Sequence, residues 1–339
     1  MHRCLQLASL AAGYVAPNPM VGAVLVHHDR IIGEGYHQQY GGPHAEVNCI
    51  HSVKEADQPL IPQAVLYVSL EPCAHFGKTP PCADLIIRHR IPKVVIGCRD
   101  PFKEVNGRGI EKLIAAGVQV EVGILEKEAA ALNKRFFTFH TQHRPYILLK
   151  WAQTADGKMA NADYSPVAIS HTLTNRLVHQ WRSKEASILV GTNTALYDDP
   201  QLTVRHWTGP NPIRLVVDLD GRLPADRQLF NKQVRTIVFN ARQHHEEENL
   251  FYYQVTKDVD LATQIVHALY QLKIQSVLVE GGARLLQSFI DAGYWDETRI
   301  ITNPTLTLGA GIPAPVLSGA KLMASEKTAG DIIQTFQQS

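Results

Sequence analysis

This chain of 339 residues has few cysteines, no long apolar run and almost no net charge. Its five cysteines are an odd and sparse set, which argues against a disulfide framework and for a reducing compartment, so we expect a cytoplasmic protein. No apolar run approaches the roughly eighteen residues that a bilayer span requires, and the first residues lack the apolar stretch of a secretory leader. We therefore expect no membrane segment and no membrane partner.

The charges nearly cancel, because 33 lysines and arginines stand against 32 aspartates and glutamates. A net charge of +1 gives no general electrostatic reason to bind a polyanion, so we expect no nucleic-acid partner, although a local basic pocket could hold one phosphate. The hydrophobic content of 45% is typical of a globular α/β protein. The length exceeds what one hydrophobic core usually organises and predicts two domains.

Helix-like and strand-like stretches alternate through the first half. The apolar periodicity predicts helices near 3–12, from about 44, at 82–89 and at 109–116, and strands at 21–27, 31–35, 64–70, 93–98 and 118–122. This alternation predicts one three-layer α/β domain.

A break in the pattern separates the two halves. The segment 137–145 (FTFHTQHRP) is polar, rich in histidine and closed by a proline, so we expect an irregular boundary there and divide the chain into domains 1–140 and 141–339. The second half alternates again, with expected strands at 146–151, 188–191, 213–218, 236–239 and 276–280 and helices at 173–183 and 261–272. It predicts a second α/β domain.

One imidazole and two thiols in the first half form a candidate metal site. His44 opens the run HAE that ends at Glu46, Cys73 follows a predicted strand, and Cys82 opens a predicted helix after two prolines. These ligand types suit Zn²⁺, and three protein ligands leave the fourth tetrahedral position free for water. Zinc lowers the pKa of such a water to about 7, and Glu46 is the carboxylate placed to move its proton. The pattern therefore indicates a catalytic zinc.

Two plainer interpretations of these residues stay open. The cysteines could be small core residues and His44 an ordinary satisfied side chain, although three such residues in consecutive α/β units favour a metal. A purely structural zinc would need a fourth ligand, for which His75 is available, and would leave Glu46 without a task.

The spacing of the ligands indicates a reaction. H-x-E followed by P-C-x-x-C is the signature of zinc nucleobase deaminases, and hydrolytic deamination is therefore predicted. Here eight residues rather than two separate Cys73 from Cys82, and this insertion could project polar groups over a substrate. A nucleic-acid-editing deaminase is a second interpretation, against which the near-neutral charge argues.

Longer motifs give the chain a resemblance to a known family. They are 16–22 (APNPMVG), 35–37 (GYH), 43–46 (PHAE), 71–82 (EPCAHFGKTPPC) and 100–109 (DPFKEVNGRG) in the first half, and 150–158 (KWAQTADGK), 188–191 (ILVG), 198–205 (DDPQLTVR) and 279–282 (VEGG) in the second. Together they resemble, nearly end to end, the bifunctional riboflavin-biosynthesis enzymes, in which a pyrimidine deaminase is fused to a uracil reductase.

For the first domain the resemblance implies a cytidine-deaminase-like fold. It implies a small phosphorylated pyrimidine as the partner, 2,5-diamino-6-(5-phosphoribosylamino)pyrimidin-4(3H)-one, from which ammonia is removed. The residues implied to line the substrate pocket are Asn18, His37, His75 and Lys78. Their chemistry suits this role, since an amide can bind a pyrimidine edge and cationic groups can bind a phosphate.

For the second domain the resemblance implies a dihydrofolate-reductase-like fold that uses NADPH to reduce the ribose of the uracil product to ribityl. The residues implied to bind the substrate are Lys150, Ser170, Arg182, Asp198, Leu202, Arg205 and Glu280. Those implied to bind the cofactor are Ala152, Thr194, Asp198 and Gly282. A glycine pair at a strand end lets a pyrophosphate approach the backbone N–H groups of a helix N-terminus. We also expect a homo-oligomer, either a dimer or a tetramer.

One departure from the family falls in the second domain. Where the family usually has a Glu-Ser-x-Trp-Ile-Thr run, residues 164–170 read YSPVAIS. Ser170 keeps a hydroxyl, but the tryptophan is absent, and Pro166 and Ala168 change the stiffness of the loop and remove an aromatic surface. A deaminase with an inactive reductase domain is therefore the alternative interpretation.

Overall fold

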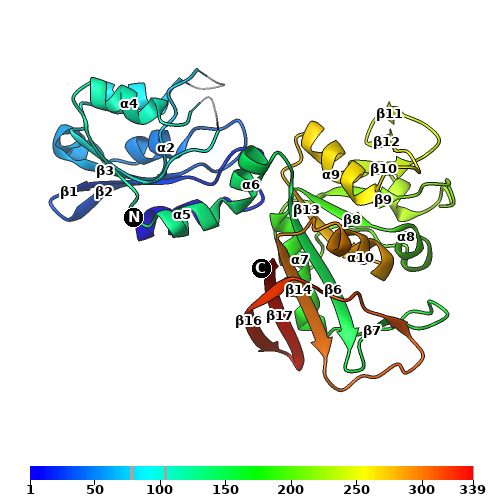
Figure 1. The fold of residues 1–339 in the computed structure, drawn as a ribbon. Coiled ribbons are helices and arrows are strands. Elements are labelled where there is room, and N and C mark those ends of the chain that lie inside the picture. Colours follow the sequence, from blue (N-terminus) through cyan, green and yellow to red (C-terminus); the bar gives the residue numbers. More distant parts are fainter. Residues whose placement is uncertain (77–79, 103–104, 339) are drawn as a thin grey trace. The chain divides into compact units, whose positions relative to one another are not determined.

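The computed structural model describes residues 1–76, 80–102 and 105–338. The chain divides into two compact units, Met1–His143 and Arg144–Ser339 (Figure 1). Each unit has its own sheet and its own hydrophobic core. Both units are α/β, as the alternating pattern predicts.

The first unit is built on a mixed sheet with the strand order β2-β1-β3-β4-β5. Strand β1 pairs antiparallel with β2 and β3, whereas β3, β4 and β5 run parallel. The strands are β1 (Gly22–His27), β2 (Arg30–Tyr36), β3 (Val65–Leu70), β4 (Lys93–Cys98) and β5 (Gln119–Val122). Because β3 and β4 are parallel neighbours, the segments that follow them leave the sheet at the same edge.

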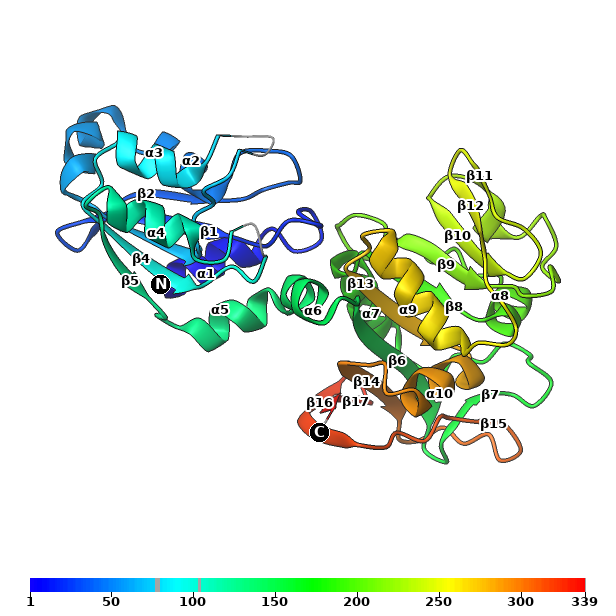
Figure 2. The same cartoon turned by 45° about the horizontal axis from the view of Figure 1, so that its top comes forward.

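Helices cover both faces of this sheet and complete the three layers that the sequence predicts (Figure 2). One face carries α2 (Ala45–His51), α3 (Cys82–Arg88) and α4 (Arg108–Ala115), and the other carries α1 (His2–Ser9) and α5 (Glu126–Leu132). A 3₁₀ helix, η1 (Glu55–Gln63), leads into β3.

Glycines bring α2 against the sheet. A Cβ at Gly35 of β2 would lie 2.2 Å from the backbone nitrogen of Cys49 and 2.7 Å from the carbonyl oxygen of Ala45, and one at Gly33 would lie 2.6 Å from the carbonyl oxygen of Cys49. Only glycine permits so close an approach of helix and strand. The first turn of α2, which begins directly after His44, is thereby fixed over β2.

A buried carboxylate ties the end of β3 to α4. Glu71 is 4% exposed, and its Oε1 accepts hydrogen bonds from the backbone N–H groups of Gly109 (3.0 Å) and Ile110 (3.4 Å). Its Oε2 accepts from Gly107 (3.0 Å) and Asp100 (3.3 Å). The carboxylate thus satisfies N–H groups at the helix N-terminus that have no partner within the helix, where a negative charge is also favoured.

The expectation of irregular structure at 137–145 is wrong for most of these residues. Residues 137–142 belong to α6 (Lys134–Gln142), which ends the first unit. Phe136 and Phe139 lie three residues apart, on one side of a helix, and both are buried, so apolar contact overrides the polar composition of the segment. The helix ends at Gln142, and the capping residue after it, His143, has a left-handed conformation (φ 54°).

The second unit contains a larger sheet with the order β11-β12-β10-β9-β8-β13-β6-β14-β17-β16. From β12 to β14 the neighbours are parallel, and antiparallel pairing occurs at the two ends, between β11 and β12, between β14 and β17, and between β17 and β16. The strands are β6 (Tyr146–Thr154), β8 (Ser187–Val190), β9 (Ile213–Val217), β10 (Thr236–Asn240), β11 (His245–Glu247), β12 (Leu250–Gln254), β13 (Ser276–Gly281), β14 (Glu297–Asn303), β16 (Ala320–Thr328) and β17 (Asp331–Gln338). A small separate pair consists of β7 (Lys158–Ala160) and β15 (Ile312–Pro313).

Helices again lie on both faces of this sheet. Residues of α9 (Leu261–Gln271) and α10 (Ala283–Asp291) pack in one core cluster with Leu149, Leu189 and Val279. On the opposite face, α8 (Thr192–Asp198) and α7 (Thr172–Lys184) contribute to two other clusters, and a 3₁₀ helix, η2 (Gln228–Phe230), joins the cluster of α8. The expected strands and helices of this half are confirmed. The elements that the sequence did not predict include α8 and the strands β7, β11, β12, β14, β15, β16 and β17.

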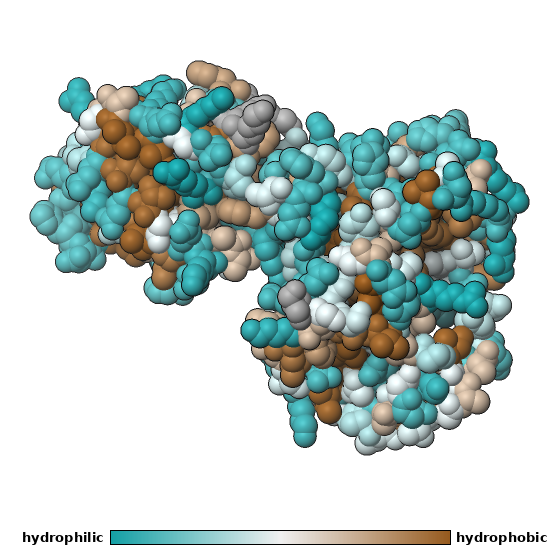
Figure 3. All heavy atoms as spheres, viewed as in Figure 1, coloured by the Kyte–Doolittle hydropathy of each residue, from teal (hydrophilic) through white to brown (hydrophobic). Residues whose placement is uncertain are grey.

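The surface of each unit is mixed in character. On the side seen in Figure 3, hydrophilic residues are interspersed with smaller apolar patches. Within the described ranges, none of the helices combines the length and the apolar character needed to cross a membrane.

The Glu71 anchor yields a testable prediction. Glu71→Gln replaces one acceptor oxygen by an NH₂ group, which leaves buried backbone N–H groups facing a donor and should destabilise the first unit by about 2–3 kcal/mol. Amide hydrogen exchange should show lost protection at Gly107, Gly109 and Ile110. The matched control is Glu34→Gln, which removes an exposed ion pair with Arg3 and should change little. Unchanged protection in Glu71→Gln would contradict the anchoring role.

Candidate active sites in the two units

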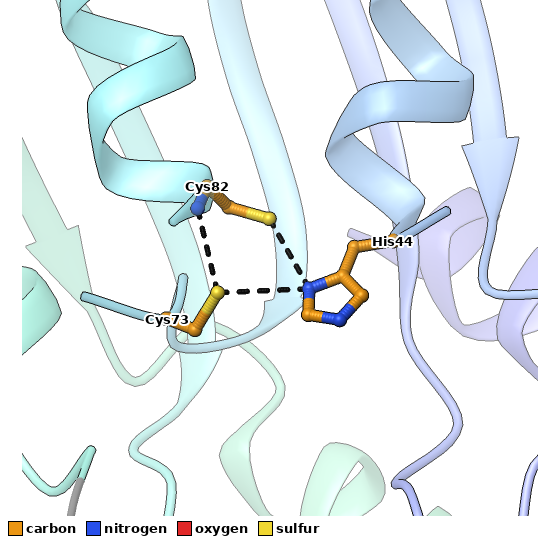
Figure 4. A group of neighbouring side chains, drawn as sticks. All are labelled: His44, Cys73 and Cys82. Carbon is orange, nitrogen blue, oxygen red and sulfur yellow. Dashed lines mark hydrogen bonds between the residues drawn. The ribbon is translucent and has the colours of Figure 1, made fainter. Parts of the chain in front are cut away.

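Three side chains from separate segments converge in the first unit (Figure 4). His44 is the residue before α2, Cys82 opens α3, and Cys73 lies in the segment after β3. The His44 Nδ1 atom lies 3.3 Å from the Cys82 Sγ atom and 3.6 Å from the Cys73 Sγ atom. Within the described ranges, these three residues form a group whose candidate ligand atoms all lie within 4.8 Å of one another. A nitrogen and two sulfurs at this spacing fit a tetrahedral zinc ion.

The surroundings favour a thiolate at this cluster. Hydrogen bonding from Cys82, with further help from His44, lowers the pKa of Cys73 to about 4. The backbone N–H of Cys82, at the N-terminus of α3, also donates to the Cys73 sulfur over 3.4 Å. The pKa of Cys82 is raised, because it shares its proton with Cys73 and is buried. A thiolate is the form of cysteine that binds metal.

Glu46 lies in the first turn of α2, two residues after His44, and is 3% exposed. Burial, followed by the negative charge of Cys73, raises its pKa. A carboxyl group with a raised pKa takes up a proton more readily than a free one and can pass it on, as a general acid–base group must. The structure therefore brings together the three predicted ligands and the predicted proton carrier.

The hydrogen bonds of His37 fix its tautomer. Its Nδ1 atom lies 2.9 Å from the carbonyl oxygen of Pro43, which can only accept, so the proton is on Nδ1. Its Nε2 atom is then the acceptor for the Asn18 Nδ2 group at 3.0 Å. Burial lowers the pKa of His37, so the ring is neutral. The His37 ring stands edge-on to that of His44, 5.4 Å between centroids, which places the predicted pocket residues Asn18 and His37 beside the candidate metal site.

The remaining predicted pocket residues are His75 and Lys78. The Nδ1 atom of His75 is buried and has no hydrogen-bond partner among the described residues. Lys78 lies outside the described residues. Phe102 and His140, which were not predicted from the sequence, have rings 4.9 Å apart, and the Phe102 ring also lies 6.4 Å from that of His75. Their positions on a loop and in α6 carry no local sequence signal.

In the second unit a buried ion pair stands at the centre of the predicted substrate residues. Arg182 of α7 binds Glu280 of β13 in a bidentate manner, with distances of 2.7 and 2.8 Å. Lys150 of β6 lies 3.8 Å from the same carboxylate. Burial alone would raise the pKa of Glu280, but Arg182 and Lys150 outweigh it and lower the pKa to about 2. Glu280 is therefore ionised and holds both cations in place.

A pocket of about 900 Å³ opens beside this ion pair. Three predicted substrate residues, Lys150, Arg182 and Arg205, line it. The lining residues that the sequence analysis did not single out are Thr172, Asn175, Arg176, Val178, His179, His206, Trp207 and Thr208. Most of them come from α7 and from the segment after Arg205, and the helical spacing of Asn175, His179 and Arg182 is the signal that could have identified them.

Glycines stand directly before the helices α8 and α10, beside the predicted cofactor residue Thr194. The Gly191 N–H donates to the Gly281 carbonyl oxygen over 2.8 Å, which joins the start of α8 to the end of β13. Gly282 precedes the first residue of α10, and the Thr194 Oγ1 atom lies 3.4 Å from the point where a Cβ at Gly282 would stand. Bare backbone at a helix N-terminus fits a pyrophosphate.

The other predicted residues of the second unit have varied surroundings. Leu202 is 2% exposed and packs in the core cluster that includes Ala195 of α8. Asp198 ends α8, and burial raises its pKa. Ala152 packs with Val178 and Ile301. Ser170 precedes the α7 cap and is partly buried.

The segment 164–170 does carry an aromatic surface, although the tryptophan is absent. The Tyr164 ring stacks on Tyr197 of α8 with centroids 4.5 Å apart and planes 6° apart. Its hydroxyl accepts a hydrogen bond from Asn193 Nδ2 over 3.2 Å. Tyr164 thus lies against the helix that contains Thr194 and Asp198.

Comparisons with known families match the two units separately. Residues 1–98 match the model of the cytidine and deoxycytidylate deaminase zinc-binding region, and residues 145–331 match the model of the RibD C-terminal domain. The zinc-binding match covers His44, Cys73 and Cys82. The predicted fold class, with a cytidine-deaminase-like first domain, is confirmed.

Relatives match along almost the whole chain. The riboflavin biosynthesis protein RibD of Aquifex aeolicus is 41% identical over 318 residues, which cover 92% of this chain and 88% of the relative. RibD of Escherichia coli is 34% identical over 325 residues, covering 90% and 87%.

A solved structure from Thermotoga maritima gives the same result. It is described as a diaminohydroxyphosphoribosylaminopyrimidine deaminase/5-amino-6-(5-phosphoribosylamino)uracil reductase, and it superposes with a TM-score of 0.91 at 36% identity over 100% of this chain and 97% of its own. The match spans both units and confirms the resemblance that the sequence motifs indicate. The chain belongs to the RibD family of bifunctional riboflavin-biosynthesis enzymes, which join a zinc-binding deaminase domain to a reductase domain.

Proposed function

We propose that residues 1–140 deaminate 2,5-diamino-6-(5-phosphoribosylamino)pyrimidin-4(3H)-one and that residues 141–339 reduce the ribose of the resulting uracil to ribityl with NADPH. The observation that carries the first half is the convergence of His44, Cys73 and Cys82 beside a buried Glu46. The reductase part of the proposal is supported by the basic pocket beside the Arg182–Glu280 ion pair and by the glycine turn that ends at Gly282.

In the deaminase, His44, Cys73 and Cys82 would hold the zinc ion, and bound zinc supplies a water that is activated at neutral pH. Deamination adds the oxygen of water to the amino-bearing ring carbon and breaks its bond to nitrogen, so one proton must reach the departing ammonia. Glu46 moves that proton, since burial raises its pKa. Asn18, held by the neutral His37, orients the pyrimidine edge, and His75, whose buried Nδ1 has no described partner, contacts the substrate.

In the reductase, Lys150, Arg182 and Arg205 bind the phosphorylated substrate. Glu280 holds Arg182 through two hydrogen bonds and lies 3.8 Å from Lys150, which keeps both cations at the pocket wall. Thr194, Asp198, Ala152 and the backbone at Gly282 would hold NADPH, which supplies the hydride when bound. The Tyr164–Tyr197 stack favours an active reductase over the inactive alternative, because it restores an aromatic surface in the altered segment.

The other expectations from the sequence stay predictions. They are a cytoplasmic location, a dimer or tetramer, and the absence of nucleic-acid and membrane partners. Close relatives along the whole chain favour a free pyrimidine substrate over the editing of a flipped base.

The role of Glu46 is tested by Glu46→Gln. The amide keeps the shape of the side chain but cannot carry a proton, so ammonia release from the diamino-pyrimidinone phosphate should fall by about 10²–10⁴-fold. Zinc content measured by mass spectrometry should stay the same as in the wild-type protein. Glu55→Gln, at an exposed carboxylate of η1, is the control and should keep full activity. Full activity in Glu46→Gln would refute the assignment.

The reductase assignment is tested by NADPH oxidation after addition of the deaminated substrate. The wild-type protein should oxidise NADPH, and Lys150→Met should lower kcat/KM by about a hundredfold, because a buried cation that faces the substrate is lost. Deaminase activity should not change. The control is Lys321→Met, at an exposed lysine of β16. A wild-type protein that deaminates but never oxidises NADPH would establish the inactive-reductase alternative.

A further inference from the structure

Cationic side chains line the pocket of the second unit, and one of its walls is a segment without regular structure. The described residues that line it include four lysines and arginines, Lys150, Arg176, Arg182 and Arg205, and no aspartate or glutamate. Three of the four lie on β6 or α7. Arg205 lies instead in the segment 203–208, together with His206, Trp207 and Thr208.

His179 of α7 holds this segment. The backbone N–H of Arg205 donates to the His179 Nδ1 atom over 3.1 Å. A backbone N–H can only donate, so Nδ1 is unprotonated and the ring carries its proton on Nε2. Burial and the charges of Arg182, His206 and Arg205 lower the pKa of His179 to about 4, which keeps this acceptor free of a proton at neutral pH.

Further contacts hold the same segment. The Arg182 Nη1 atom donates to the Thr203 carbonyl oxygen over 3.4 Å. The Val204 N–H donates to Asn211 Oδ1 over 2.8 Å. Gly209 lies so close to α7 that a Cβ there would stand 2.6 Å from the Cβ of Ser183. The His206 ring lies edge-on to His179, 4.7 Å between centroids.

We propose that His179 is a positioning residue of the reductase, which places Arg205 and the segment after it for the phosphate of the substrate. Arg182, one turn along α7, already lines the pocket, so the His179 acceptor ties the Arg205 backbone to the same helix. The Arg205 guanidinium itself donates to Gln201 Oε1 over 2.7 Å. This inference rests on the proposed reductase function.

An uncharged imidazole suits this position better than the alternatives. A carboxylate would also accept the Arg205 N–H, but it would add a negative charge beside Arg205 and repel the phosphate. An apolar side chain would leave the N–H without its partner and release the segment. A neutral acceptor holds the backbone and leaves the positive charge of the pocket intact.

The test compares two variants of His179. His179→Phe keeps a ring of similar size without the acceptor, and His179→Asn keeps an acceptor near the position of Nδ1. In His179→Phe, KM for the phosphorylated substrate should rise about tenfold while KM for NADPH and deaminase activity stay unchanged; His179→Asn should recover most of the loss. The matched control is His267→Phe, at an exposed histidine of α9.

Ribose 5-phosphate provides a readout that does not depend on turnover. Calorimetric titration should show weaker binding to His179→Phe than to the wild-type protein or to His179→Asn. Equal affinity in all three proteins, or an equal loss in the Phe and Asn variants, would overturn the positioning role. Absence of NADPH oxidation by the wild-type protein would instead refute the reductase assignment itself.

Discussion

The carboxyl ends of parallel strands set the positions of both candidate sites. In the first unit, β3 and β4 run parallel, so Cys73 and the segment from Asp100 leave the sheet at the same edge. In the second unit, β6, β8 and β13 are parallel neighbours, and the pairing of Val279 with Leu149 places Glu280 beside Lys150. Ligands of open α/β sheets bind outside such strand ends, because the helices that follow present free N–H groups there.

Within that arrangement, buried polar contacts hold each site in place. Glu71 joins the segment before Cys73 to the N-terminus of α4, and His37 orients Asn18 beside His44. In the second unit, Glu280 holds Arg182 and Lys150, and His179 holds the backbone of Arg205. Each of these groups is buried and each satisfies its partners, so the side chains that face a ligand are ordered before it binds.

The sequence predicted the metal site better than the pocket of the second unit. His44, Cys73 and Cys82 were identifiable because zinc requires particular ligand types, and those types stood at the starts of helices and after a strand. The elements that contain them were also predicted, since their apolar periodicity is strong. His179 and Trp207 were not identified, because their importance depends on contacts between α7 and a segment more than twenty residues away in the chain.

Other residues were misjudged for equally physical reasons. The polar composition of 137–145 concealed α6, which two buried phenylalanines stabilise. The antiparallel strands β16 and β17 pair with each other at the end of a sheet, and β16 is largely exposed, so their periodicity is weak. The loss of the tryptophan from segment 164–170 can be seen in the sequence, whereas the stack of Tyr164 on Tyr197 depends on the fold and could not be predicted.

The proposed deaminase function depends most on a zinc ion that His44, Cys73 and Cys82 hold with one position left for water. X-ray absorption of the purified protein at the zinc edge measures it directly. The account predicts about one zinc per chain with two sulfur ligands near 2.3 Å, one nitrogen near 2.0–2.1 Å and one light atom from water. A protein without zinc, or a zinc ion with four protein ligands, would contradict the account.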